Sequence, residues 1–220
     1  MKNGQPDNDP ATTDEEVEVV VGRVRLGGRL HLSAKTIGTV LFVHGSGSSR
    51  HSPRNRYVAA ALNRAGLGTL LFDLLTPTEE LDRANVFDIG LLAGRLNEAT
   101  AWLASHESWV KQPIGYFGAS TGAAAALWAA ADLGGDVSAV VSRGGRPDLA
   151  GSRLAEVLAP TLLIVGGFDV DVLELNREAL ASLGGGSRLE VVPGASHLFE
   201  EPGALDRVAA LAEKWFTSHF

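Results

Sequence analysis

One serine of the 220-residue sequence has neighbours of the types that nucleophilic chemistry requires. Ser120 lies within the run Gly118-Ala119-Ser120-Thr121-Gly122. A short apolar segment, Ile114 to Phe117, precedes this run, and an alanine-rich segment with strong helix propensity, Ala123 to Ala131, follows it. Glycines permit a strained turn between a strand and a helix, and such a turn exposes its serine beside the first N–H groups of the helix. We therefore predict that Ser120 is a nucleophile.

A serine hydroxyl is a weak nucleophile near neutral pH, so it needs a histidine as base and a carboxylate that orients the histidine. Where the serine lies on such a turn, the acid and then the histidine follow later in the chain. Asp169 follows the apolar segment Pro160 to Val165, and His197 follows Leu189 to Val192. Both come directly after a predicted strand, where catalytic residues of parallel sheets lie. Asp171 is an alternative acid, but Asp169 is nearer to the strand end and is preferred.

Acyl transfer also needs hydrogen-bond donors for the negative oxygen that develops during the reaction. The backbone N–H of Thr121, the residue after the nucleophile, is predicted to be one donor. The second is expected from the loop His44 to Ser49, which follows the apolar segment Thr39 to Val43. Ser46 is the preferred second donor, and Gly47 is the alternative.

Cationic residues and two further histidines lie on loops expected near the same sheet edge. The candidates for substrate binding among them are His44, Arg50, His51, Arg143 and Arg146, and Arg54 is close by. Guanidinium groups bind carboxylates and phosphates through two parallel hydrogen bonds, so these residues are able to recognise an anionic substrate. Alternatively, the arginines pair with local carboxylates such as Asp73 and Asp148 and brace the loops, and this interpretation is preferred.

The segments that position these residues alternate between strand and helix. Residues 17–26 and 29–33 alternate between apolar and polar side chains around Gly27-Gly28, which predicts a β-hairpin at one end of a sheet. Later strands are expected near residues 39–43, 68–72, 114–117, 137–141, 160–165 and 189–192, with helices near 54–65, 88–105, 123–131, 173–183 and 204–216. This pattern predicts an α/β fold with a mostly parallel, doubly wound sheet of about eight strands and helices on both faces. Only a short segment separates Val141 from Pro160, so any cap over the site is minimal.

Length and composition predict one α/β domain over residues 17–220, with an apolar fraction of 45% that suits a buried sheet. Residues 1–16 are polar and acidic, so we expect a disordered N-terminal tail and no signal peptide. The chain has no cysteine, which excludes disulfides and thiolate metal sites. A net charge of −7 and the lack of a membrane-spanning apolar run argue against nucleic-acid and membrane partners. A soluble, cytoplasmic protein is expected, and a homo-oligomer is left open.

These motifs resemble those of the α/β-hydrolase superfamily over nearly the whole chain from Val17. The sequence is similar to the dienelactone-hydrolase-like group in four runs, which are His44 to Pro53, Gly118 to Gly122, Ser142 to Asp148 and Gly194 to Glu201. Dienelactone hydrolases use a cysteine nucleophile, and this chain has none. The resemblance therefore implies a serine hydrolase, and an esterase in particular.

The combined interpretation is a carboxylic ester hydrolase that acts on small or short-acyl esters through Ser120, His197 and Asp169. This chemistry needs no metal or organic cofactor. A thioesterase, an amidase or a perhydrolase would use the same three residues, and a ligand-binding protein on a hydrolase fold is a further alternative. Since nucleophile, base and acid are all present, the sequence favours an enzyme over a binding protein.

Overall fold

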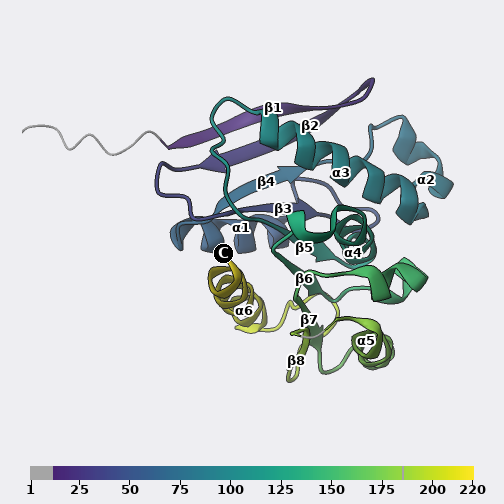
Figure 1. Ribbon diagram of the computed structural model, residues 1–220. Coiled ribbons are helices and arrows are strands. Elements are labelled where there is room, and N and C mark those ends of the chain that lie inside the picture. The colour runs from purple at the N-terminus through teal and green to yellow at the C-terminus, as the bar shows by residue number, and fades with distance from the viewer. Residues whose placement is uncertain (1–11, 185) are drawn as a thin grey trace, which may run out of the picture.

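The computed structural model describes residues 12–184 and 186–220, in which eight strands form one open sheet with the order β1-β2-β4-β3-β5-β6-β7-β8 (Figure 1). The strands are β1 (Thr13–Val21), β2 (Val24–Leu32), β3 (Thr39–Val43), β4 (Gly68–Phe72), β5 (Ile114–Ala119), β6 (Ala139–Arg143), β7 (Thr161–Gly166) and β8 (Arg188–Val192). β1 and β2 are antiparallel, β2 is antiparallel to β4, and all other neighbours are parallel. The predicted mostly parallel sheet is confirmed.

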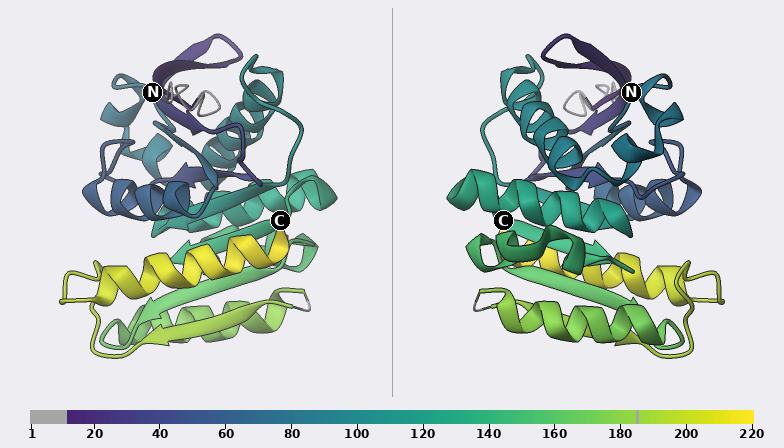
Figure 2. Two further views of the ribbon diagram at one scale, coloured as in Figure 1. Left: turned by 90° about the vertical axis from the view of Figure 1, so that its left-hand side faces the viewer. Right: turned by 90° about the vertical axis from the view of Figure 1, so that its right-hand side faces the viewer.

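Helices cover both faces of this sheet (Figure 2). One face packs against α3 (Ile89–Ser105), α4 (Thr121–Leu133) and α5 (Val170–Ser182), and the other against α1 (Pro53–Arg64) and α6 (Ala204–His219). The central parallel strands are buried at every residue, because apolar side chains point alternately into the two layers. Tyr116, for example, lies in the core on the α3 and α4 side, whereas Phe117 lies in the core on the α1 and α6 side.

The antiparallel hairpin lies at the predicted end of the sheet, but its predicted turn is wrong. β1 and β2 are joined at Gly22-Arg23, and Gly22 has a φ of +57°, which suits glycine in a tight turn. Gly27 and Gly28 instead lie inside β2, opposite Glu18 and Val17. Glycine within a strand commonly marks a close approach of another group. A Cβ at Gly27 would be only 2.8 Å from the guanidinium of Arg50, so this glycine makes room for that side chain.

The predicted boundary of the N-terminal tail also needs correction. Residues 13–16 belong to β1, where Asp14 is opposite His31 and Glu16 is opposite Arg29 in the ladder with β2. Pairing with β2 orders these polar residues despite their composition, and Asp14 accepts two hydrogen bonds from Arg29. The rest of the predicted tail, residues 1–11, lies outside the described residues. No helix in the described part of the chain is long and apolar enough to cross a membrane.

Short helices occupy two of the connections between the strands. The connection from β4 to α3 contains the 3-10 helix η1 (Glu79–Leu81) and α2 (Arg83–Phe87), and the side chain of Asp88 caps the first turn of α3. The connection from β6 to β7 is the 3-10 segment η3 (Pro147–Glu156), which packs against α4 and α5. Because η3 lies against these helices, the expectation of a minimal cap at this connection agrees with the structure.

Candidate active site

Ser120 lies on a sharp turn between β5 and α4, as the sequence predicts. Its φ of 52° and ψ of −124° are strained values for a residue other than glycine. The turn is possible because its neighbours lack side chains: a Cβ at Gly122 would be 2.2 Å from the carbonyl oxygen of Val43, and one at Gly118 would be 2.5 Å from Cα of Ala123. A backbone hydrogen bond joins the turn to the neighbouring strand β6, since Ser120 N–H donates to the carbonyl of Arg143. Strain of this kind is typical of a nucleophile turn.

The predicted base and acid are in direct contact. His197 Nδ1 donates to Asp169 Oδ2 at 2.6 Å, with the Asp169 side chain 15% exposed and the His197 side chain 38% exposed. Asp169 follows β7 and precedes α5, while His197 is on the loop after β8. These two segments are held together by a hydrogen bond from Phe168 N–H to the carbonyl of Ala195. Asp171, the alternative acid, lies in the first turn of α5. The contact therefore favours Asp169.

Ser120 and His197 line one pocket of about 320 Å³, which we call the serine pocket. Its remaining lining is residues 45–48 and 52 on the loop after β3, Arg54 and Asn55 in the first turn of α1, and Ala119, Arg143 and Leu198. No hydrogen bond joins Ser120 Oγ to His197 among residues 12–184 and 186–220. Catalytic bonds of this type are often long without substrate, so the shared pocket is the relevant observation.

The two predicted oxyanion donors lie side by side next to the sharp turn that holds Ser120. Ser46 N–H donates to the hydroxyl of Thr121 at 2.9 Å, and Thr121 begins α4 directly after Ser120. Thr121 is buried, whereas Ser46 and the alternative donor Gly47 are both exposed on the loop after β3, and both line the serine pocket. The structure therefore brings Ser46 and Thr121 to the nucleophile. Their role as oxyanion donors stays a prediction.

His44 is unsuited to the predicted role in substrate binding. It lies at the end of β3, is buried, and uses both ring nitrogens on the backbone: Nδ1 donates to the carbonyl of Gly45, and Nε2 accepts from Leu74 N–H, each at 3.1 Å. Burial lowers the pKa of His44 below its ordinary value of 6.5, so the neutral ring is favoured. We conclude that His44 links the loop after β3 to the segment after β4.

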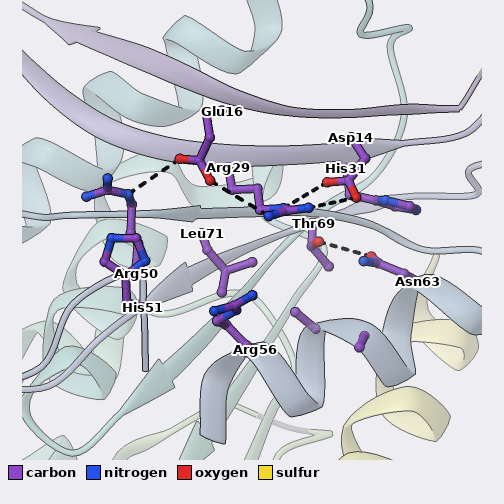
Figure 3. Close-up of a pocket in the computed structure, with 12 residues that line it drawn as sticks. Asp14, Glu16, Arg29, His31, Arg50, His51, Arg56, Asn63, Thr69 and Leu71 are labelled. Carbon is purple, nitrogen blue, oxygen red and sulfur yellow. Dashed lines mark hydrogen bonds and ion pairs between the residues drawn. The ribbon is translucent and has the colours of Figure 1, made fainter. Parts of the chain in front are cut away.

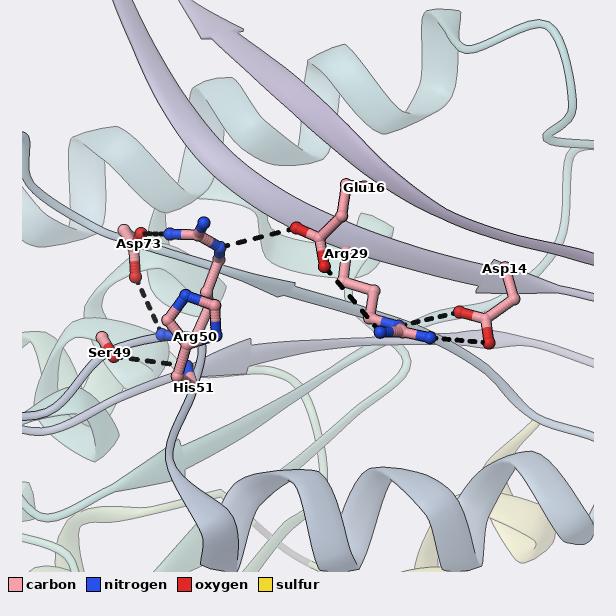
Figure 4. Close-up of polar contacts among 7 residues, drawn as sticks. All are labelled: Asp14, Glu16, Arg29, Ser49, Arg50, His51 and Asp73. Carbon is pink, nitrogen blue, oxygen red and sulfur yellow. Dashed lines mark hydrogen bonds and ion pairs between the residues drawn. The ribbon is translucent and has the colours of Figure 1, made fainter.

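Arg50 and His51 lie outside the serine pocket, which corrects the prediction for these two residues. They line a separate pocket of about 380 Å³ between the β1–β2 hairpin and α1, which we call the hairpin pocket (Figure 3). Arg50 forms an ion pair with Asp73, its backbone N–H also donates to Asp73, and Glu16 is 3.8 Å away (Figure 4). The alternative that Arg50 pairs with Asp73 and braces the loop is therefore confirmed.

The three remaining arginines differ in their partners. Arg146 makes two hydrogen bonds to Asp148, at 2.8 and 2.7 Å, so it braces its loop as the second interpretation predicts. Arg54 contacts Glu200 at 3.2 Å. Arg143 is 8% exposed, and its Nε and Nη1 atoms have no hydrogen-bond partner in the described part of the chain. Burial, with a smaller contribution from the charge of Arg54, lowers the pKa of Arg143 to about 10.

Two features of the site were missed by the sequence analysis. Asn55, in the first turn of α1, is 3% exposed and lines the serine pocket. A second pocket, of about 340 Å³, also borders the loop 45–48, and its other lining residues are His44, Ser49, Leu74, Leu75, Glu80, Val86 and Leu92. In sequence, Asn55 is an ordinary polar residue of a helix, and Leu74 and Leu75 lie in a connection that has no strong periodicity. Leu92 belongs to the predicted helix near 88–105, where an apolar residue is an ordinary core residue. Only their packing around the loop after β3 identifies them.

Comparisons with known proteins agree with this architecture. The chain is similar to the crystal structure of a dienelactone hydrolase from Anabaena variabilis, with 56% identity, a TM-score of 0.92, and coverage of 95% of this chain and 99% of that one. An esterase domain from Rhodothermus marinus is 18% identical with a TM-score of 0.76 over 94% of this chain and 99% of its own, which shows a shared fold alone. A scan against protein-family models found no match.

A curated relative from Mycobacterium tuberculosis, strain H37Rv, is 63% identical over 96% of this chain. Its name is "Putative phosphoribosyl transferase", and the match covers 48% of its length. This chain thus spans about half the length of that relative. The name describes the whole of the longer protein, so it does not by itself describe the matched half.

Proposed function

Since the chain belongs to the dienelactone hydrolase family of α/β-hydrolases, we propose that it is a serine hydrolase that cleaves small carboxylic esters with Ser120, His197 and Asp169. One observation carries the proposal. The strained Ser120 shares its pocket with His197, and His197 is hydrogen-bonded to Asp169. A nucleophile, an oriented base and an acid in this relation are the groups needed for acyl transfer.

In the proposed reaction, Ser120 Oγ attacks the ester carbonyl carbon while His197 Nε2 takes the hydroxyl proton. Asp169 accepts the Nδ1–H bond, which fixes the tautomer and stabilises the imidazolium. The C–O bond to the alcohol then breaks, and the alcohol leaves with the proton from His197. Water, deprotonated by the same histidine, attacks the acyl-enzyme and releases the carboxylic acid. One ester and one water give one acid and one alcohol.

The oxyanion that forms in both steps would be bound by the backbone N–H groups of Thr121 and Ser46. Ser46 N–H donates to the Thr121 hydroxyl in this structure, so the substrate oxygen has to replace that hydroxyl as acceptor. Such a donor contributes about 3–4 kcal/mol to lowering the barrier in enzymes of this type, because it is already placed where charge develops. The 46–47 segment is thus expected to rearrange locally on substrate binding.

Short acyl groups fit the pockets that the structure describes. Because η3 packs against α4 and α5, distal methylenes of a long acyl chain have no cover from the β6–β7 connection. Each buried CH₂ contributes about 0.8 kcal/mol, so a chain gains affinity only as far as it reaches apolar walls. The pocket lined by Leu74, Leu75, Val86 and Leu92 offers such walls near the loop 45–48.

The proposal is tested with 4-nitrophenyl esters from acetate to palmitate. We expect hydrolysis with a kcat/KM that peaks at short chains and falls beyond roughly six to eight carbons, because added methylenes then gain no contact. Ser120→Ala measures the background. The absence of serine-dependent hydrolysis across the series would contradict the proposal, whereas a steady rise through the long chains would contradict only the short-acyl preference.

We attribute the phosphoribosyl transferase name of the mycobacterial relative to the part of that protein that this chain does not match. The matched half is 63% identical to this chain, whose architecture is that of an α/β-hydrolase and whose serine pocket contains Ser120 and His197. Expression of each half of the relative, followed by ester and phosphoribosyl transfer assays, would test this division. We expect ester hydrolysis only from the half that corresponds to this chain.

A further inference from the structure

A fully buried amide of α5 is bonded to the chain segment beside the site. Asn176 is 0% exposed, and its Nδ2 donates to the carbonyl of Gly145 at 2.9 Å and to that of Val172, one turn earlier in α5, at 2.7 Å. Its Oδ1 has no hydrogen-bond partner in the described residues. A buried polar group without a partner is unfavourable, so packing alone does not explain an amide at this position. The bond to Gly145 is the contact that an apolar residue could not replace.

Residues 144–146, which we call the 144–146 loop, contact both the proposed nucleophile and the proposed base. Arg146 N–H donates to the carbonyl of Ser120 at 3.1 Å. Gly144 lies against His197, because a Cβ at Gly144 would be 3.2 Å from the carbonyl oxygen of His197 and 3.5 Å from its Nδ1. The position of this loop therefore affects the separation of Ser120 and His197.

The 144–146 loop depends on outside contacts for its conformation. Two of its three residues are glycines, which have more conformational freedom than other residues, and Gly144 has a φ of +52°. Gly144 N–H donates to the carbonyl of Ile164 in β7 at 2.8 Å. The loop is thus bonded to β7 through Gly144 and to α5 through Gly145 and Asn176.

The helix α5 also has the proposed acid at its start. Asp169 directly precedes the first turn of α5, and Leu173 N–H donates to its carbonyl at 2.8 Å. Asn176 follows Asp169 by about two turns of helix, so the two residues lie on the same side of α5. One helix therefore connects Asp169 with the loop that contacts Ser120 and His197.

We propose that Asn176 is a positioning residue, which holds the 144–146 loop against α5 and thereby keeps Ser120 aligned with His197. Asn176 acts through the loop backbone and touches no substrate. This inference rests on the proposed function, because it concerns the alignment of the same reaction. A displacement of about 1 Å between reacting groups lowers a rate by about 100-fold. Loss of the bond to Gly145 should therefore slow the reaction of Ser120 without unfolding the protein.

The first measurement follows the loop itself and needs no turnover. Asn176→Leu keeps a branched side chain of similar size but has no N–H donor. We expect amide hydrogen exchange at Arg146, whose N–H is bonded to Ser120 in the folded chain, to become at least tenfold faster in this variant. Ala179→Gly is the matched control, because it weakens the same buried side of α5 at a residue whose side chain has no polar atom. It should change this exchange rate less than threefold. Unchanged exchange at Arg146 in Asn176→Leu would refute the proposal.

The second measurement follows the rate and the end point of fluorophosphonate labelling at Ser120, at a temperature where circular dichroism shows the variants to be folded. We expect Asn176→Leu to reach one label per chain, as wild type does, but at least tenfold more slowly. The kcat/KM for 4-nitrophenyl acetate should fall by a similar factor, and Ala179→Gly should keep both rates within threefold. A merely structural role would instead lower the end point and leave the rate of the folded fraction unchanged. That result would refute the proposal.

A further variant and the wild-type protein separate the remaining outcomes. If Asn176→Leu does not fold, Asn176→Ser takes its place. Its hydroxyl bonds the carbonyl of Val172 in the preceding turn and is too short to reach Gly145, so the same slow labelling is expected. Labelling at the wild-type rate in a folded Asn176 variant would refute the role of Asn176 and leave the esterase proposal intact. If wild type is neither labelled nor able to hydrolyse esters, the proposed function fails, and this inference fails with it.

Discussion

The hairpin pocket and the serine pocket both contain arginines, and they differ in how those arginines are paired. In the hairpin pocket, Arg29 is bound by Asp14 and Arg50 by Asp73 (Figure 4), whereas Arg56, the third arginine of this pocket, is exposed to solvent. In the serine pocket, Arg143 is more deeply buried and lacks partners on Nε and Nη1 in the described residues. Arginine content is therefore a poor guide to a ligand site. The informative observation is a buried cation that the fold leaves unpaired beside reactive groups.

The largest expected effect tests whether the serine pocket is the one that does chemistry. Asp169→Asn should lower kcat about 10³- to 10⁴-fold while the fold is kept, because the carboxylate orients His197 and stabilises its protonated form. Asp171→Asn, two residues away in the first turn of α5, is the control and should change kcat by less than about threefold. Purified variants are compared with a short-chain 4-nitrophenyl ester after circular dichroism. The opposite ranking would transfer the acid role to Asp171.

A smaller effect is expected from a substitution in the hairpin pocket, and it should change the stability of the protein and not its catalytic rate. Asp73→Asn should lower the free energy of unfolding by about 1–3 kcal/mol, because it leaves the partly buried Arg50 without its charge partner. The kcat/KM should stay within about threefold of wild type. Urea denaturation and the ester assay measure the two quantities. A large loss of activity in a stable variant would mean that the hairpin pocket takes part in catalysis.

Removal of the unpaired Arg143 cation should change the free energy of unfolding in the opposite direction, or leave it unchanged. Arg143→Met replaces a buried charge with an apolar side chain of similar length, so we expect the free energy of unfolding to be unchanged or to rise by up to about 3 kcal/mol. The measurement is the same urea titration, carried out beside Asp73→Asn. A marked loss of stability would show that Arg143 has an internal partner, and the contrast between the two pockets would disappear.

The smallest effect concerns the pH dependence of stability and involves His44. Burial lowers the pKa of His44 below 6.5 in the folded chain. Just below pH 6.5, His44 is therefore protonated in the unfolded chain but stays neutral in the folded chain. The contribution of the neutral His44 ring to the free energy of unfolding is fully present above pH 6.5. It is lost as the pH falls below 6.5, by up to about 1.4 kcal/mol per pH unit. His44→Gln should therefore show a shallower loss of stability from pH 6.5 to 5 than wild type. Equal slopes would show that His44 titrates normally in the folded state.

The sequence was informative where chemistry depends on position along a strand. Ser120, Asp169 and His197 each follow an apolar segment, and the carboxyl ends of parallel strands meet at one edge, so their proximity was predictable. The pairing of Arg50 with Asp73 and of Arg146 with Asp148 was also among the alternatives, because a nearby carboxylate is the usual partner of a surface arginine. These inferences need only local pattern and topology.

Other features depend on contacts that no local pattern records. The hairpin turn was misplaced because Gly27-Gly28 looks like a turn, whereas it lies within β2 and makes room for Arg50. Whether Arg143 is paired depends on residues from α1 and from the loop after β8, which are distant in sequence. Asn55 gave no signal for the same reason. In this protein, the residues proposed for catalysis could be placed near one another from the sequence, but the residues packed around them could not.

The central claim is that Ser120, activated by His197, is the reactive serine of this chain. The most direct test is labelling with a fluorophosphonate followed by peptide mapping, because only a serine with a base and oxyanion donors reacts readily. We predict one labelled residue, Ser120, with no labelling in Ser120→Ala or in heat-unfolded protein, and strongly slowed labelling in Asp169→Asn. Label on Ser46 or Ser48, or labelling that persists in Ser120→Ala, would contradict the account.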